Sequence, residues 1–410
     1  MSKRNINRNA VKWNTLSGLI NAGQSAVILV FISHFYDVRT AGTFTIAYAM
    51  ANLFMTMGKY GVRNYQVTDI KNHFSFEEYH YQRILTVIGS FLILLAYLAF
   101  QYFSGGYSLD KTMIVLLVCL WKYVDAIEDV YYGMYQQQGR LDIGAKCYSL
   151  RLMASMLVMC VLLLLKVNFL ITMIIVIIVS VILALVLIKA SVGRFEVNHE
   201  RYMTSILAIT RICFPLFIGN SLSMFLGNSP KYLVDWYLDE NIQAICGYLM
   251  MPSFVILILS QFIYQPIIRK LADIWQDGDK SQFIGIVSRQ GLVIGALTVA
   301  IVIGGVVVGI PVLTILYNFD LSVYRAAFAI ILAAGGIYAF VSFMMVPLTV
   351  IRFQNCIAYG FIIATAIVLL LGKSLLNQFG MLGAALIFLI QNIILALYLM
   401  GCFVYKVRQS

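Results

Sequence analysis

The chain has 410 residues, of which 61% are hydrophobic and only 11% carry a formal charge. A soluble domain has about 25% charged residues, so this composition excludes an ordinary soluble protein and indicates a membrane protein. The net charge of +11 does not indicate nucleic-acid binding, because basic residues collect in the cytoplasmic loops of membrane proteins.

Apolar runs follow one another along the whole chain. A helix that crosses a bilayer needs about 20 mostly apolar residues. Such spans are expected at 13–34, 40–58, 83–103, 112–134, 145–165, 168–190, 204–228, 242–266, 286–310, 322–346, 352–372 and 381–404. We therefore predict an all-α integral membrane protein of about twelve transmembrane helices, with no sizeable soluble domain. The cysteines and histidines form no ligand cluster, so neither a metal site nor a cofactor is expected.

The distribution of basic residues predicts the orientation. With the N-terminus inside, the cytoplasmic segments hold twenty Lys and Arg residues, the outer segments six and the spans three. This asymmetry predicts that both termini are cytoplasmic. The connection at 191–203 divides the spans six and six, which predicts an N-terminal lobe at 1–196 and a C-terminal lobe at 197–410. Two halves around a central site are a common plan of transporters.

Charged residues lie in the middle of the fourth span. A charge at this depth costs about 2.5–3.5 kcal/mol unless it is paired or faces water. Lys122, Asp125 and Asp129 share one helical face, whereas Glu128 is expected to point elsewhere. Two interpretations are open: an ion pair that braces the bundle, or the wall of a water-filled cavity, which we favour because other spans also carry polar faces.

These polar faces lie on spans one, two, seven and eight. Single polar residues act as interhelical contacts, but several aligned stripes favour a hydrated cavity. Cations in it would attract a phosphate or diphosphate. Arg151 and Arg211 are close enough to the cytoplasmic ends for snorkelling to explain them equally well. The candidate substrate-binding residues are Lys122, Arg211, Arg151, Arg63, Lys59, Asn52, Asn21, Gln24, Asn220 and Gln261.

Motifs of membrane enzymes are missing from the sequence. It has no HExxH motif, no nucleophile elbow and no large acidic external loop. A protease, an esterase or a glycan polymerase therefore has no obvious site, and we expect that the chain is not an enzyme.

Several short runs resemble those of a known family. They are KYGVRNYQVTDI at 59–70, FSFEEY at 74–79, NSPKY at 228–232, GY at 247–248, QP at 265–266, LA at 271–272 and GMLGAA at 380–385. In their order along the chain they resemble polysaccharide repeat-unit flippases of the Wzx type. These flippases belong to the multidrug/oligosaccharidyl-lipid/polysaccharide (MOP) exporter superfamily, which also contains the MATE transporters.

The resemblance implies two six-helix lobes that face each other across a cationic cavity. It also implies a bacterial inner-membrane protein that moves undecaprenyl-diphosphate-linked oligosaccharide to the outer leaflet, for capsule, O-antigen lipopolysaccharide or cell-wall polysaccharide. A separate polymerase and a chain-length regulator are the implied partners besides the lipid bilayer. Some relatives couple transport to a proton or sodium gradient. The candidate residues for the coupling ion are Asp125, Glu128 and Asp129.

Three alternatives remain open. A MATE-type ion-coupled multidrug antiporter often carries cationic substrates and would favour acidic cavity walls. A flippase of the peptidoglycan precursor, lipid II, would share the fold. A membrane glycan polymerase would need carboxylates in sizeable external loops.

Overall fold

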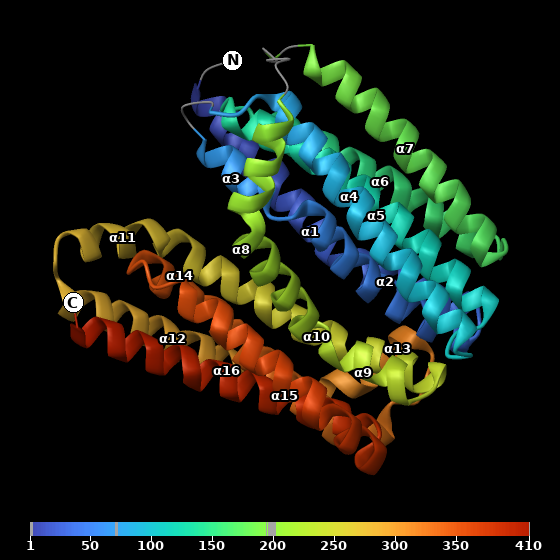
Figure 1. Cartoon of the computed structure of the whole chain (residues 1–410). Helices are drawn as coiled ribbons and strands as arrows, with labels where there is room; N and C mark the ends of the chain where they lie inside the picture. Colours follow the sequence, from blue (N-terminus) through green and yellow to red (C-terminus); the bar gives the residue numbers. More distant parts are fainter. Residues whose placement is uncertain (1–2, 70–72, 194, 196–201, 410) are drawn as a thin grey trace. The chain divides into compact units, whose positions relative to one another are not determined.

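The computed structural model describes the chain except for residues 1–2, 70–72, 194, 196–201 and 410. The described residues form helices joined by short connections (Figure 1). Two compact units can be recognised, Met1–Met224 and Phe225–Ser410. The predicted lobe boundary between residues 196 and 197 lies outside the described residues. So do three of the twenty basic residues that were counted as cytoplasmic: Lys71, Arg194 and Arg201.

The described part of the first unit contains seven helices and most of an eighth. They are α1 (Lys3–Phe35), α2 (Val38–Lys59), α3 (Val62–Thr68), α4 (Phe76–Phe103), α5 (Leu109–Gln137), α6 (Leu141–Leu164), α7 (Phe169–Val192) and α8 (Met203–Gly227). Side-chain caps define several starts. Ser75 and Glu78 form a capping box at α4, and Ser108 accepts a hydrogen bond from the backbone N–H of Lys111 at α5.

The second unit begins at the end of α8. Its elements are α9 (Ser229–Tyr237), α10 (Glu240–Tyr264), η1 (Gln265–Ile267), α11 (Ile268–Gln276), α12 (Lys280–Gly304), η2 (Gly305–Gly309), α13 (Ile310–Tyr317), η3 (Ser322–Tyr324), α14 (Arg325–Val350), α15 (Asn355–Phe379) and α16 (Met381–Gln409). The helical stretch Lys280–Tyr317 therefore runs past the predicted end of the ninth span at residue 310.

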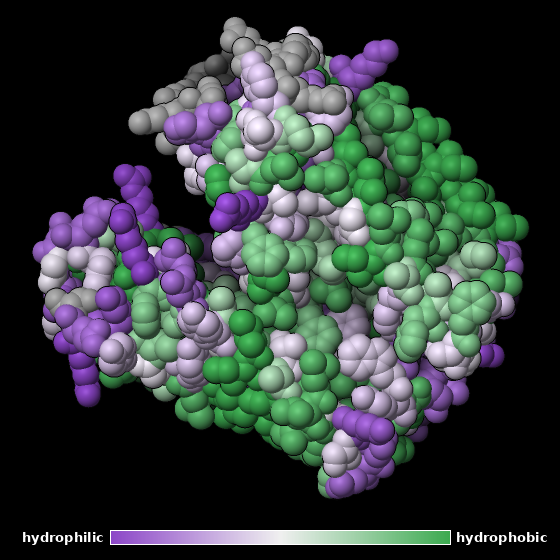
Figure 2. Space-filling view, in the orientation of Figure 1, coloured by the Kyte–Doolittle hydropathy of each residue, from purple (hydrophilic) through white to green (hydrophobic). Residues whose placement is uncertain are grey.

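Among the described residues, ten helical stretches are long and apolar enough to cross a membrane. They begin at residues 9, 76, 141, 169, 203, 240, 280, 322, 355 and 381. Figure 2 shows hydrophobic residues over α7 and the helices beside it, and hydrophilic residues over α11. The remaining two predicted spans correspond to α2 and α5, which have 22 and 29 residues but a more polar composition. The count of twelve spans stays a prediction.

Three short helices, α3, α9 and α11, lie between predicted spans, where no helix was predicted. α3 and α11 are short, and α11 buries Leu271 and Ile274 while it exposes its charged residues. α9 is more deeply packed, with Leu233 and Val234 at 1% and 0% exposure. Hydropathy did not identify these three helices, because a helix of seven to nine residues is too short to produce a long hydropathy signal.

Candidate functional site

A tight turn between α2 and α3 positions two cations. Tyr60 and Gly61 both have left-handed backbone conformations, with φ of 53° and 71°. Such angles favour glycine, and a Cβ at Gly61 would also lie only 2.8 Å from the Cβ of Leu216. The turn places Lys59 at the last residue of α2 and Arg63 near the start of α3, so both side chains reach the same space.

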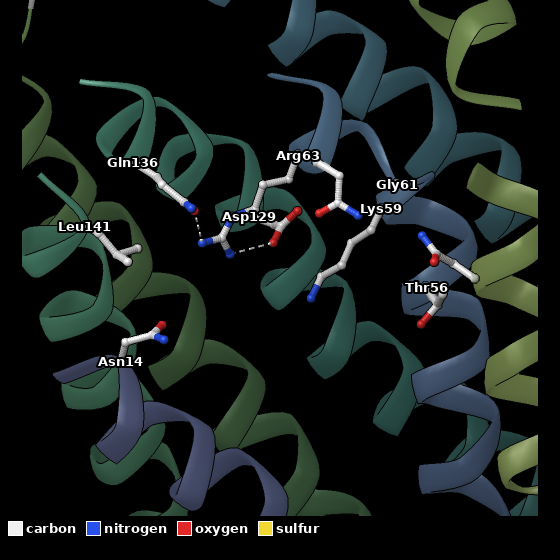
Figure 3. A pocket seen from close by; sticks show the side chains of 10 residues that line it. Asn14, Thr56, Lys59, Gly61, Arg63, Asp129, Gln136 and Leu141 are labelled. Carbon is white, nitrogen blue, oxygen red and sulfur yellow. Dashed lines mark hydrogen bonds and ion pairs between the residues drawn. The ribbon is translucent and has the colours of Figure 1, made fainter. Parts of the chain in front are cut away.

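That space is a pocket of about 400 Å³ within the first unit (Figure 3). Its walls come from α1, α2, α3, α5, α6 and α8, and most of the side chains are polar. The lining residues are Asn14, Thr56, Lys59, Gly61, Arg63, Asn64, Asp129, Gln136, Leu141 and Asn220. The pocket thus contains four residues that the sequence identified as candidates: Lys59, Arg63, Asp129 and Asn220.

Asp129 contributes a carboxylate to this pocket, and two arginines converge on it. The Nη1 of Arg63 lies 3.3 Å from Asp129 Oδ1, and the Nη2 of Arg83 lies 3.1 Å from Asp129 Oδ2. Arg63 also donates to Oε1 of Gln136 at 2.9 Å, and Arg83 to the backbone carbonyl of Ala126 at 2.9 Å. The side chain of Arg63 remains 30% exposed, whereas that of Arg83 is completely buried.

The charges of the described residues at this pocket do not cancel. Lys59, Arg63 and Arg83 supply three positive charges, and Asp129 supplies one negative charge. The remaining charge of +2 lies in a partly enclosed space, where electrostatic attraction is stronger than in bulk water. An anion is therefore the class of ligand that this pocket favours, and Arg63 offers it donors that face the space.

A second group of charged residues lies deeper, between α1, α5 and α6, and it is balanced. Lys122 Nζ lies 3.1 Å from Asp125 Oδ2, and Arg151 pairs with both Asp125 and Glu128, the latter at 2.7 Å. All four side chains are at most 3% exposed. We call these four residues the charge brace. Two cations and two carboxylates neutralise each other within the unit.

Neutral polar groups complete the charge brace. Lys122 Nζ donates to Gln24 Oε1 at 2.7 Å and to Asn21 Oδ1 at 3.4 Å. Tyr132 donates its hydroxyl hydrogen to Glu128 at 2.9 Å. Because Lys122 is 1% exposed and paired, its geometry in this structure is that of the bracing ion pair, the first of the two interpretations.

One sequence-based expectation about the charge brace was wrong, and Arg151 had been left with two open interpretations. Glu128 does not point away from the other charges, because the long side chain of Arg151 reaches both Asp125 and Glu128, one turn apart on α5. Arg151 does not snorkel, since its side chain is 0% exposed and points into the unit.

The other candidates lie outside the pocket. Asn52 is half-buried on α2, and Arg211 is exposed on α8. Gln261 is half-buried on α10 in the second unit. The structure thus brings Lys59, Arg63, Asp129 and Asn220 together and gathers Asn21, Gln24, Lys122, Asp125, Glu128 and Arg151 around the charge brace.

Sequence reasoning missed Arg83 and Gln136. Arg83 is the first residue of the predicted span 83–103 and was counted among the cytoplasmic residues, but α4 begins seven residues earlier, at Phe76, and places it inside the unit. Gln136 lies seven residues after Asp129 on α5, which puts both on one helical face. That spacing was readable from the sequence, whereas the burial of Arg83 depends on how α4 and α5 pack.

The end of α3 is fixed by Asp69. Its carboxylate accepts hydrogen bonds from the backbone N–H groups of His73 and Phe74, at 3.0 and 3.2 Å, and from the hydroxyl of Tyr79 at 2.9 Å. Burial raises the pKa of Asp69, but these hydrogen bonds outweigh burial and hold the pKa below its ordinary value. Asp69 therefore ties α3, and with it Arg63, to the start of α4.

Comparison with known proteins identifies the fold. No family model matches the chain, and no curated protein matches its sequence. The structure of the lipid II flippase MurJ in an inward closed conformation matches with a TM-score of 0.71 and 15% identity, over 95% of this chain and 87% of that one. An inward-facing multidrug resistance MATE family transporter of the MOP superfamily matches with a TM-score of 0.67 and 11% identity, over 98% and 97%.

A third match is the Vibrio cholerae MATE transporter VcmN in its bent form, with a TM-score of 0.62 and 10% identity, over 99% of this chain and 98% of that one. The chain therefore has the same all-α, MATE-like fold as these structures, and the ten long apolar helical stretches of its described residues indicate a multi-pass membrane protein. These three structures are named as those of a flippase and of two transporters.

Proposed function

We propose that this protein is a flippase that moves undecaprenyl-diphosphate-linked oligosaccharide repeat units from the cytoplasmic to the outer leaflet of a bacterial inner membrane. The observation that carries the proposal is the excess of two positive charges at the pocket around Asp129. The transported glycan serves capsule, O-antigen or cell-wall polysaccharide, and a polymerase and a chain-length regulator act after transport.

The pocket suits the diphosphate rather than the whole substrate. Its volume of about 400 Å³ is near the lower end of the range of ligand pockets, about 300–1,000 Å³. The guanidinium of Arg63 and the ammonium of Lys59 donate to phosphate oxygens, and the neutral amides of Asn220 and Gln136 donate to sugar hydroxyls. The lipid chain and the remaining sugars extend beyond the pocket.

Transport proceeds by alternating access, without a cofactor, and draws on a proton or sodium gradient. Among the three candidate carboxylates, we assign the coupling role to Asp129, because it lines the pocket and holds Arg63. Asp125 and Glu128 are occupied in the charge brace. A proton on Asp129 would release Arg63 to the diphosphate, which links the ion and the substrate through one carboxylate.

A second candidate function is transport of lipid II, favoured by the fold similarity to MurJ at a TM-score of 0.71. Transport of lipid II requires the same recognition of a diphosphate, so the pocket does not distinguish between the two candidate functions. A multidrug antiporter for cationic substrates is disfavoured, because the pocket is itself positive. The glycan polymerase is disfavoured by the transporter names of the structural neighbours.

Complementation of a deletion strain tests the proposal. Deletion should cause a lipid-linked oligosaccharide to accumulate and surface polysaccharide to disappear, and the wild-type gene should restore both. Lys59→Gln combined with Arg63→Gln should fail to restore export, whereas Arg211→Gln, an exposed arginine outside the pocket, should restore it. Accumulation of lipid II instead would favour the second candidate. Full export by the double variant would overturn the proposed role of the pocket.

A further inference from the structure

A second pocket of about 360 Å³ lies between α1, α6 and α7 in the first unit. Its walls include Trp13, Lys146 and Arg140, and its apolar part includes Leu150 and Leu187. None of its lining residues lines the pocket around Asp129. The mechanism of transport proposed above does not use it.

Two lysines contact Trp13 at this second pocket; Lys146 lines the pocket, and Lys12 does not line it. Lys146 Nζ lies 5.9 Å from the ring centroid of Trp13, and Lys12 Nζ lies 5.8 Å from the same centroid. Both distances are within the range of cation–π contact. The other charged pair cancels, since Arg140 Nε and Nη2 lie 2.9 and 3.1 Å from the two carboxylate oxygens of Asp142. Within the described part of the chain, two ammonium groups without a carboxylate partner therefore flank the tryptophan.

The apolar part of the second pocket reaches the surface of the first unit. Leu150 on α6 is 40% exposed, and Leu187 on α7 is partly exposed. Exposed apolar side chains of a spanning helix contact lipid tails. The pocket thus has a basic, aromatic rim at the helix ends and an apolar floor along α6 and α7. These two parts match the polar headgroup and the apolar chain of an amphiphile.

The rim of the second pocket lies at the depth of the lipid headgroups in a bilayer. α6 begins at Leu141 and α7 ends at Val192, so Arg140, Lys146 and Ser191 are all near helix ends. Trp residues are enriched at this depth, and the predicted orientation places these ends on the cytoplasmic side. Basic pockets between transmembrane helices on the cytoplasmic side suit anionic lipid headgroups.

We propose that this second pocket binds the phosphate headgroup of an anionic phospholipid from the cytoplasmic leaflet. Lys12 and Lys146 donate to the phosphate oxygens while they remain on the faces of Trp13, and one acyl chain lies along Leu150 and Leu187. The site is separate from the transported substrate, so it does not depend on the proposed flippase function.

Lipid binding to the purified full-length chain tests the proposal. Native mass spectrometry in a neutral detergent measures the affinity for phosphatidylglycerol and for phosphatidylcholine with the same acyl chains. Phosphatidylglycerol should bind in preference, and Lys12→Gln and Lys146→Gln should each weaken it about five-fold. Lys189→Gln removes an exposed lysine of α7 that neither lines the pocket nor belongs to the pair on Trp13, and it should leave the affinity unchanged.

Three results would overturn the proposal. The first is equal affinity for the two lipids, and the second is unchanged phosphatidylglycerol binding by the Lys12→Gln/Lys146→Gln double variant. The third is displacement of the lipid by inorganic phosphate at equal concentration, which would identify a site for a free anion. Both lysines are exposed, so the variants should fold. An unchanged Tm in the absence of lipid verifies that they do.

Discussion

The charge brace permits a quantitative prediction about Arg151. Its side chain is 0% exposed and pairs with Asp125 and Glu128. Replacement of Arg151 by Met leaves two buried carboxylates with Lys122 as their partner, so one negative charge has no counter-charge. Removal of one member of a buried ion pair costs about 3–5 kcal/mol.

Thermal unfolding of the purified protein in detergent measures this cost. The first unit spans Met1–Met224, and in domains of this size 1 kcal/mol corresponds to about 2–4 °C in Tm. Arg151→Met should therefore lower the Tm by about 6–20 °C. Arg211→Met, which removes an exposed arginine of α8, is the matched control and should shift the Tm by only about 1–2 °C.

A compensating substitution distinguishes charge balance from packing. Glu128→Gln removes the second carboxylate, and the glutamine Oε1 still accepts the hydroxyl hydrogen of Tyr132. The Arg151→Met/Glu128→Gln double variant should recover at least half of the lost Tm, because Lys122 and Asp125 then balance. A double variant as unstable as Arg151→Met, or a single variant as stable as wild type, would refute the reasoning.

Three further predictions concern other positions. Burial lowers the pKa of Lys231 to about 8. Below pH 8 the ammonium is charged in both the folded and the unfolded protein, and burying this charge destabilises the folded protein. The Tm of wild type should therefore rise relative to that of Lys231→Met between pH 8 and 10. A constant Tm difference across that range would contradict this. Gly61→Ala should cost about 1–3 kcal/mol through its left-handed backbone and its contact with Leu216, measurable as a lower Tm. Asp69→Asn should have a lower Tm than wild type at pH 7, because it lacks the stabilising carboxylate. Wild type loses the same stability as the pH falls through the lowered pKa of Asp69, so the two Tm values should converge in acid.

The membrane-spanning helices were readable from the sequence because hydropathy accumulates over about 20 residues and needs no partner. Ten of the predicted spans coincide with apolar helices of the structure. α2 and α5 were found by the same argument, although their polar residues weaken the signal. α9 was missed because its burial comes from neighbouring helices, and its nine residues hold Lys231 beside apolar ones.

The candidate site was only partly predictable. Helical spacing identified Asp129 on the face of Lys122 and placed Lys59 and Arg63 at one end of the second span. Spacing within one helix does not say which groups meet across helices. Arg83 reaches Asp129, and Arg151 reaches Glu128, only because of the rotation of α4 and α6 about their axes. The separation into a balanced charge brace and a positive pocket follows from these pairings.

Flipping by purified protein in liposomes tests the central claim most directly. A fluorescent undecaprenyl-diphosphate oligosaccharide is placed in one leaflet, and its appearance in the other is measured by quenching. Wild type and Arg211→Gln should transport it at equal rates, and Lys59→Gln/Arg63→Gln should be at least about ten-fold slower, since each lost charge-assisted hydrogen bond costs about 1.5–3 kcal/mol. Transport by the double variant at the wild-type rate would show that the pocket around Asp129 does not hold the diphosphate.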